Sequence, residues 1–260
     1  MIIATWNVNS VRQRLPHLLD YLREKSPDAL CLQETKCLDE AFPRMEIEEL
    51  GYNIATHGQK GFNGVAILAK RPIEVARGLP GDPDDEQARY IEAVIPTERG
   101  AVRVASIYLP NGNPAPGEKY AYKLAFMERL IQHARLLLTY EEPLVLTGDY
   151  NVIPDPRDAA HPEAWVQDAL FLPATRAKFR ELIALGLTDA LRATSDDGGL
   201  YTFWDYQAGS WQRNNGIRID HALLSPQALD RLAAVDIDRD MRGREKASDH
   251  VPVRVTLKHL

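Results

Sequence analysis

The sequence predicts an α/β protein in which mixed β-sheets are covered by helices on their outer faces. Short apolar, β-branched runs of strand length recur along the whole chain, and helical patterns separate only some of them. Several of these runs follow one another directly within residues 65–109, so antiparallel neighbours are needed and a regular strand–helix alternation is disfavoured. No segment rich in Gly, Ser or Pro divides the chain, so we expect one domain over residues 1–260.

The runs that predict strands are bounded by polar or turn-forming residues, as buried and half-buried strands usually are. In chain order they are Ile2–Thr5, Ala29–Gln33, Val65–Ala69, Tyr90–Ile95, Val102–Leu109, Leu144–Thr147 and Val251–Leu257.

Three helices are predicted from apolar spacing. Pro16 and the leucines that follow it indicate a helix over roughly 15–25. Apolar residues over 124–138 are spaced 3, 4, 3 and 4 apart, which describes one face of a long helix. A shorter helix is expected over Arg176–Leu185, ended by Gly186.

Composition excludes several classes of protein. The 31 Lys+Arg and 37 Asp+Glu give a net charge of −6, so any polyanion must be bound by a local basic patch. No run of about 18 apolar residues is present, and the N-terminus does not resemble a signal peptide, so we expect no membrane contact. Two cysteines, Cys31 and Cys37, cannot build a disulfide framework or a four-ligand zinc site, and free thiols indicate the cytoplasm.

Polar residues gather where the predicted strands end, and strand ends are where sites on sheet proteins usually lie. The residues are Asn7, Asn9, Glu34, Tyr108, Asn111, Asp149, Asn151, Asp220, Asp249 and His250.

Each of these residues, taken alone, also has a purely structural explanation. Glu34 could be a surface or helix-start carboxylate, and Asp149 with Asn151 could close a turn. Tyr108 could lie at the rim of the core, and His250 could be an ordinary buried histidine with its hydrogen bonds satisfied. No single signal decides between structure and function.

Taken together, the same residues form an inventory of carboxylates, amides, one tyrosine and one histidine. Hard oxygen ligands select Mg²⁺, or Mn²⁺, over softer metals. A histidine beside an aspartate is a phosphate contact or an acid–base group, and amides contact a polyanion without adding negative charge. The inventory indicates metal-assisted phosphodiester hydrolysis. Acyl transfer and ATP use are disfavoured because GxSxG and GxxxxGK[ST] motifs are absent from the sequence.

Eight motifs carry a family resemblance: WNVNSVR, LQETK, GVAIL, YLPNG, GDYNV, YTFWDY, GIRIDH and SDHVP. Together they resemble the exonuclease III family of apurinic/apyrimidinic endonucleases, within the endonuclease/exonuclease/phosphatase group that includes deoxyribonuclease I. The resemblance spans residues 3–253. It implies a four-layer α/β sandwich, with two mixed β-sheets face to face and helices outside.

The resemblance also implies a metal site. Glu34 is the implied Mg²⁺ ligand, with Asn7 hydrogen-bonded beside it, and Asp249 is an outer or second-site ligand. Asn9 stands where some relatives carry aspartate, so one or two metals stay open.

The implied catalytic residues lie beside that metal. Asp149 would orient or deprotonate the attacking water, and His250, oriented by Asp220, is both a phosphate ligand and the competing base. The implied contacts to the scissile phosphate are Tyr108, Asn111 and Asn151.

A small apolar pocket is expected to accept a base-less sugar and to exclude a base by size. Its implied wall consists of Phe203, Trp204, Ile217 and Ile219. Trp204 also fits simple core packing. Trp211, in the polar loop 207–215, is expected to be exposed and to insert into the duplex.

DNA binding by an acidic chain requires local cations, and these follow or flank the motifs. They are Arg12, Arg14, Lys36, Arg213, Arg218, Arg239, Arg242, Arg244 and Lys246. Neighbouring acids leave a solvated mixed face as the alternative for residues 238–246, and Asp220 could simply pair with Arg218.

The resemblance predicts a Mg²⁺-dependent DNA repair nuclease that cuts 5′ to abasic sites and acts on blocked 3′ ends, with 3′-phosphodiesterase and 3′→5′ exonuclease activity. Its partner would be double-stranded DNA, and a monomer would suffice. A phosphatase-branch enzyme and a catalytically silent nucleic-acid-binding regulator are the alternatives. The balance among the nuclease activities stays open.

Overall fold

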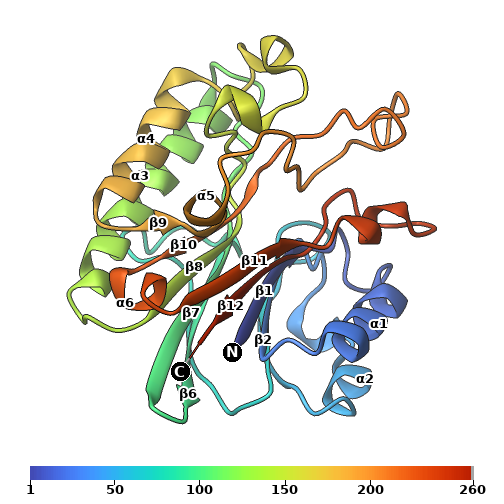
Figure 1. The fold of residues 1–260 in the computed structure, drawn as a ribbon, viewed down its shortest axis with the longest axis vertical. Coiled ribbons are helices and arrows are strands. Elements are labelled where there is room, and N and C mark those ends of the chain that lie inside the picture. The colour runs from blue at the N-terminus through green and yellow to red at the C-terminus, as the bar shows by residue number, and fades with distance from the viewer. Residues whose placement is uncertain (259–260) are drawn as a thin grey trace.

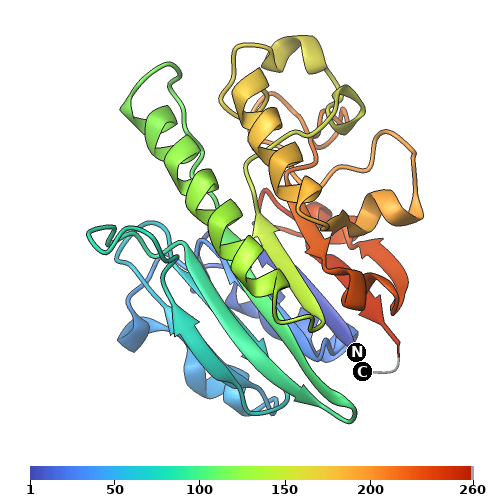
Figure 2. The ribbon, with the colours of Figure 1, turned by 90° about the vertical axis from the view of Figure 1, so that its left-hand side faces the viewer.

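The chain folds into two six-stranded β-sheets that lie face to face, with helices on both outer faces (Figures 1 and 2). The structure is a computed structural model and describes residues 1–258. The expected four-layer α/β sandwich is therefore confirmed. Within the described residues no helix combines the length and the apolar character needed to cross a membrane.

The first sheet contains one parallel pair among antiparallel neighbours. Its strands, in spatial order, are β11 (Leu232–Ile237), β12 (Val253–Leu257), β1 (Ile2–Asn7), β2 (Ala29–Gln33), β4 (Val65–Ala69) and β3 (Asn53–His57). The parallel pair is β1 and β2, so both strands end at the same edge of the sheet.

The second sheet repeats this arrangement. Its strands, in spatial order, are β5 (Glu74–Arg77), β6 (Tyr90–Thr97), β7 (Gly100–Tyr108), β8 (Leu144–Asp149), β10 (Asp220–Leu224) and β9 (Thr188–Asp189). The parallel pair here is β7 and β8, with Tyr108 opposite Asp149 in the register.

The helices divide between the two outer faces. The α-helices are α1 (Leu15–Lys25), α2 (Arg44–Glu48), α3 (Glu118–Leu138), α4 (Pro173–Ala184), α5 (Ala190–Thr194) and α6 (Pro226–Leu229). Short 3-10 turns are η1 (Asp39–Ala41), η2 (Pro156–Asp158), η3 (Pro162–Trp165) and η4 (Arg239–Gly243). Apolar residues of α1 and α2 pack on the first sheet, and those of α3 and α4 pack on the second.

Side-chain alternation along the strands decides which residues lie between the sheets. Ile3 of β1 and Val145 of β8 belong to the inter-sheet core. Because successive residues of a strand point to opposite faces, Asn7 and Asp149 share the face of these core residues. The last inward-facing position of each strand is thus polar, at the edge where the sandwich opens.

The sequence patterns located seven of the twelve strands in the described residues and the three long helices. All seven predicted strands are present, α1 and α4 match the predicted helices with small shifts at their ends, and α3 begins at Glu118, six residues before the predicted range. Strands β3, β5, β9 and β11 were missed because they are short or partly exposed sheet edges, with polar residues such as Glu74 and Arg77 in place of an apolar run. The buried interior strand β10 was missed because it begins with Asp220 and His221, which leaves an apolar run of only three residues.

Candidate active site

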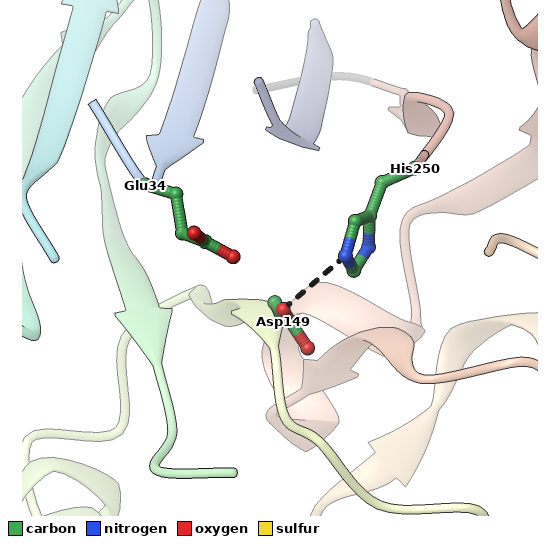
Figure 3. A group of neighbouring side chains, drawn as sticks. All are labelled: Glu34, Asp149 and His250. Atoms are coloured by element: carbon green, nitrogen blue, oxygen red, sulfur yellow. Dashed lines mark ion pairs between the residues drawn. The ribbon is translucent and has the colours of Figure 1, made fainter. Parts of the chain in front are cut away.

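Three ionisable side chains from distant parts of the chain converge at the open edge of the sandwich. Glu34 follows β2, Asp149 ends β8, and His250 precedes β12 (Figure 3). One ligand atom of each lies within 4.8 Å of those of the other two. The convergence on which the predicted function depends is therefore present.

Asn7 links the two sheets at this point. Its Nδ2 donates to Glu34 Oε1 and to Asp149 Oδ2, both at 2.9 Å, and its Oδ1 accepts from the backbone N–H of Asn9 at 3.0 Å. All of the Asn7 amide is thus occupied within the protein. Asn7 orients the two carboxylates, which agrees with its expected place beside Glu34.

Backbone conformation directs Glu34 toward Asp149 and His250. Its φ of +51° lies in the left-handed region, and the next residue, Thr35, donates its N–H to Gly64 O. A Cβ on Gly64 would lie 2.1 Å from Thr35 Oγ1, so only glycine fits beside this bend. The glycine of the GVAIL motif therefore serves the loop that presents Glu34.

Lys36 takes a place in the site that sequence reasoning did not assign to it. Its Nζ lies 3.0 Å from Glu34 Oε2 and donates to Asn9 Oδ1 at 2.5 Å. Asn9 Nδ2 in turn donates to Asp249 Oδ1 at 3.3 Å. The signal was its position two residues after Glu34, which brings the ammonium back to the carboxylate across the bend.

The imidazole of His250 lies between the carboxylates of Asp149 and Asp220. His250 Nδ1 lies 2.9 Å from Asp220 Oδ2, and His250 Nε2 lies 3.6 Å from Asp149 Oδ2 (Figure 3). Asp149 and Asp220 are register partners in the β8–β10 pair, so one imidazole reaches both. The predicted orientation of His250 by Asp220 is present in the geometry.

The pKa values of Asp149 and His250 are both raised, but for different reasons. Burial raises the pKa of Asp149 to about 7, against the opposing effect of the His250 charge. Burial alone would lower the pKa of His250, but the carboxylates of Asp220 and Asp149 outweigh it and raise that pKa well above its ordinary value. The two carboxylates therefore favour the protonated, cationic form of His250.

The pKa of Glu34 is lowered, whereas that of Asp149 is raised. Burial favours its neutral form, yet the hydrogen bond from Asn7 and the charges of Lys36 and His250 together lower its pKa. Glu34 is thus a stable anion with 18 % of its side chain exposed to solvent. An anionic oxygen of this kind suits a hard divalent cation.

The residues expected at the scissile phosphate surround Asp149. The half-buried Tyr108 has its pKa raised well above its ordinary value, first by burial and then by the Glu34 and Asp149 charges. Asn151 donates its backbone N–H to Asp149 Oδ1 at 3.0 Å and its Nδ2 to Leu109 O at 2.8 Å. Asn111 is exposed, and its Oδ1 accepts from the backbone N–H and the Nδ2 of Asn113.

The residues predicted to form the pocket wall lie at different depths in the structure. Phe203 is half-buried with its ring centroid 5.0 Å from that of His250, while Ile217 and Ile219 are buried behind it. Trp204 is fully buried in the core beside Tyr201, so its assignment to the pocket is wrong and the core-packing alternative is confirmed. Trp211 is half-buried against Trp204, with ring centroids 5.0 Å apart, and is not the exposed wedge that was expected.

The predicted cations fall into two groups. Arg218 is fully buried in ion pairs with Asp158 and Asp189, so its assignment to DNA is wrong. Arg242 is also buried and donates to the Trp204 carbonyl, while Arg244 pairs with Asp20 and Glu24 of α1. The exposed members are Arg12, Arg213, Arg239 and Lys246.

Comparisons with known proteins agree with this arrangement. The model of the Endonuclease/Exonuclease/phosphatase family matches residues 4–250. The exodeoxyribonuclease III of Haemophilus influenzae is 37% identical over 270 residues, which cover 99% of this chain and all of that protein.

Two solved structures are similar over their whole lengths. A 3′ phosphatase (NExo) from Neisseria, bound to a product DNA hairpin, has a TM-score of 0.96 at 38% identity and covers 100% of both chains. An AP endonuclease from Archaeoglobus fulgidus has a TM-score of 0.94 at 36% identity, again over 100% of both chains. The chain belongs to the endonuclease/exonuclease/phosphatase family.

Proposed function

We propose that this protein is a Mg²⁺-dependent DNA repair nuclease that hydrolyses the phosphodiester 5′ to abasic sites and also acts at blocked 3′ ends. The observation that carries the proposal is the meeting of Glu34, Asp149 and His250 within 4.8 Å at the open edge of the sandwich. The names of similar proteins support it, since they include an exodeoxyribonuclease, a 3′ phosphatase with product DNA and an AP endonuclease.

The donor set fits a hard cation. Glu34 and the carboxylate of Asp149 offer oxygen, and Asp249 lies at the far side of Asn9. Glu34 would hold Mg²⁺, with Mn²⁺ as a substitute. When bound, the ion offsets negative charge on the phosphoryl and leaving oxygens.

Asp149 is the proposed base for the attacking water. Its two oxygens are fixed by N–H donors from Asn151 and Asn7, at 3.0 and 2.9 Å. A pKa of about 7, raised by burial, gives it basicity suited to neutral pH. His250 is the weaker candidate for the base because two carboxylates hold it in its protonated, cationic form.

His250 and its neighbours are proposed to bind the phosphate and the sugar. The imidazolium of His250, the Tyr108 hydroxyl and the amides of Asn111 and Asn151 supply donors to phosphoryl oxygens. Phe203 presents its half-buried ring beside His250, which provides an apolar surface for a base-less sugar. Extrusion of an abasic nucleotide costs less than extrusion of a stacked one, so selection needs no base readout.

One complete cluster per chain supports action as a monomer on double-stranded DNA. Both cysteines are free and buried, which suits a reducing compartment, and we place the protein in the cytoplasm.

The test is nicking of a duplex that carries a single tetrahydrofuran site, an abasic analogue, with and without Mg²⁺. We expect one incision on the 5′ side that EDTA abolishes, and no incision of the same duplex without the lesion. A phosphatase-branch enzyme would leave the duplex intact and release phosphate from small monoesters. A regulator would shift the duplex in a binding assay without cutting it, and either result would refute the nuclease.

A further inference from the structure

A buried lysine lies beneath the loops that carry the proposed phosphate contacts. Lys123, in the second turn of α3, is fully buried and is the one lysine among the buried polar residues of the described chain. Gly112 closes over it, since a Cβ there would lie 2.6 Å from Lys123 Cδ. Lys123 has no role in the proposed hydrolysis mechanism.

Its ammonium joins two segments that come from different strands. Lys123 Nζ donates to the Asn111 carbonyl at 3.0 Å and to the Asn151 carbonyl at 2.5 Å. Asn111 lies just beyond β7 and Asn151 just beyond β8. One buried group therefore holds the backbone of both proposed phosphate-contacting amides.

The same two segments are tied together on their inner side. Leu109 N donates to Asp149 O at 2.9 Å, and Asn151 Nδ2 donates to Leu109 O at 2.8 Å. Asn151 adopts a left-handed φ of +47°, a conformation that costs free energy unless its surroundings hold it. The bond from Lys123 to its carbonyl is a contact that supports this conformation from outside.

The Lys123 amine can donate to both backbone carbonyls whether it is charged or neutral. Burial lowers the pKa of Lys123 to about 7, against the opposing charges of Asp149 and Asp168. A neutral amine has two N–H donors and an ammonium has three. Either form can therefore donate to both the Asn111 and the Asn151 carbonyl. Removal of the amine would leave two carbonyls without this donor in a buried place.

We propose that Lys123 is a positioning residue, which fixes the two loops so that the Asn111 amide and the Asn151–Asp149 unit face the same phosphate. The proposal rests on the proposed function, because those residues are placed at the phosphate there. Lys123 acts through the backbone and contacts neither DNA nor metal.

The test compares Lys123→Met with Leu130→Ala. Methionine keeps an unbranched apolar stem but removes the donors, whereas Leu130 is buried on the same helix away from the loops and provides a matched packing loss. We expect kcat/KM on the tetrahydrofuran duplex to fall at least tenfold in Lys123→Met, at a temperature where both variants are folded, and to stay within about twofold in Leu130→Ala. Lys123→Gln, which restores an N–H donor, should recover part of the loss.

Amide hydrogen exchange gives a readout that does not depend on activity. Peptides that cover 109–113 and 149–153 should exchange at least tenfold faster in Lys123→Met than in Leu130→Ala. Equal exchange in the two variants, or full activity of Lys123→Met, would overturn the proposal. A wild type that fails to cut the duplex refutes the proposed function instead, and exchange then still decides whether Lys123 clamps the loops. If the methionine variant does not fold, Lys123→Gln carries the comparison with a smaller expected effect: peptides that cover 109–113 and 149–153 should exchange severalfold faster in Lys123→Gln than in Leu130→Ala, and equal exchange would overturn the proposal.

Discussion

Two buried clusters of aspartate and histidine lie next to each other, and a single short segment contributes to both. Asp220 faces His250 in the active site, while Arg218 and His221 join Asp158 and Asp189 in a second cluster. Both clusters are almost inaccessible to water. Burial and residue type therefore do not separate a functional cluster from a structural one.

The balance of charge separates them. In the second cluster two arginines meet two aspartates: Arg218 Nε lies 2.7 Å from Asp158 Oδ1, Arg192 also pairs with Asp158, and Arg218 Nη1 lies 2.9 Å from Asp189 Oδ2. Burial would raise the pKa of Asp158, but the Arg218 and Arg192 charges and hydrogen bonds outweigh it and lower that pKa. This cluster is complete without a ligand.

The active site is short of cations by comparison. Glu34, Asp149 and Asp220 face His250 and the half-exposed Lys36, and burial raises the pKa of Asp149. A cluster with surplus carboxylate is ready for a divalent ion, and one with an equal number of arginines is not.

Asp149→Asn gives the sharpest test of this contrast. We expect the rate of abasic-site incision to fall by about 10³- to 10⁴-fold, because the base is lost while the amide keeps the shape of the side chain. Stability should hold or rise, since one buried carboxylate is removed from a surplus. Incision kinetics and urea denaturation measure the two effects, and a variant that keeps most of its rate would contradict the assignment.

Asp158→Asn should show the reverse pattern. Removal of this carboxylate takes the counter-charge from Arg192 and one of the two counter-charges from the buried Arg218, so we expect the free energy of unfolding to fall by about 3–5 kcal/mol. Incision by the folded variant, measured well below its unfolding temperature, should stay within about threefold of wild type. Loss of activity without loss of stability would place Asp158 in the functional cluster.

The sequence predicted seven of the strands and the active-site acids because both signals are local to a short segment. An apolar run such as Ile2–Thr5 marks a strand, and a polar residue such as Asn7 marks the end of that strand. The sequence could also list Glu34, Asp149 and His250 as candidates, since each interrupts an apolar run.

The errors arise where burial depends on contacts made outside the local sequence pattern. Arg218 pairs with Asp158, 60 residues earlier, so nothing near it distinguishes a structural arginine from one that binds DNA. Trp211 owes its half-burial to Trp204 and to Arg239, whose guanidinium carbon lies 4.4 Å from its ring centroid. Nothing in the helical pattern over 124–138 marks Lys123, because its burial depends on Gly112, which lies outside that pattern and covers the side chain.

The pKa of His221 extends the comparison of the two clusters to the pH dependence of stability. Burial and the Arg218 charge lower the pKa of His221 to about 4, and its ring accepts from Arg218 and donates to Val152 O. The unfolded chain binds this proton near pH 6.5 and the folded chain does not, so the His221 contribution to stability decreases as pH falls from 6.5 to 4.

Between pH 6.5 and 4, the lowered pKa of His221 reduces the free energy of unfolding by about 3 kcal/mol. His221→Gln should therefore flatten the stability of the protein between pH 6.5 and 4 relative to wild type, in urea denaturation at several pH values. Carboxylates titrate alike in both proteins, so the difference isolates the histidine. Parallel stability curves would mean that the pKa of His221 is the same in the folded and unfolded chains, and would contradict the lowered pKa.

The smallest expected effect comes from two arginines five residues apart. Arg213 is exposed in the loop before β10, whereas Arg218 is buried among carboxylates. If exposed cations bind DNA phosphates, Arg213→Ala should weaken binding severalfold and reduce the slope of log affinity against log salt by about 0.9. Arg218→Gln should lower stability but leave that slope unchanged, because a guanidinium already paired inside the protein releases no counterions from DNA. Equal slopes for wild type and Arg213→Ala would remove this loop from the DNA-binding surface and leave Arg12, Arg239 and Lys246 to account for it.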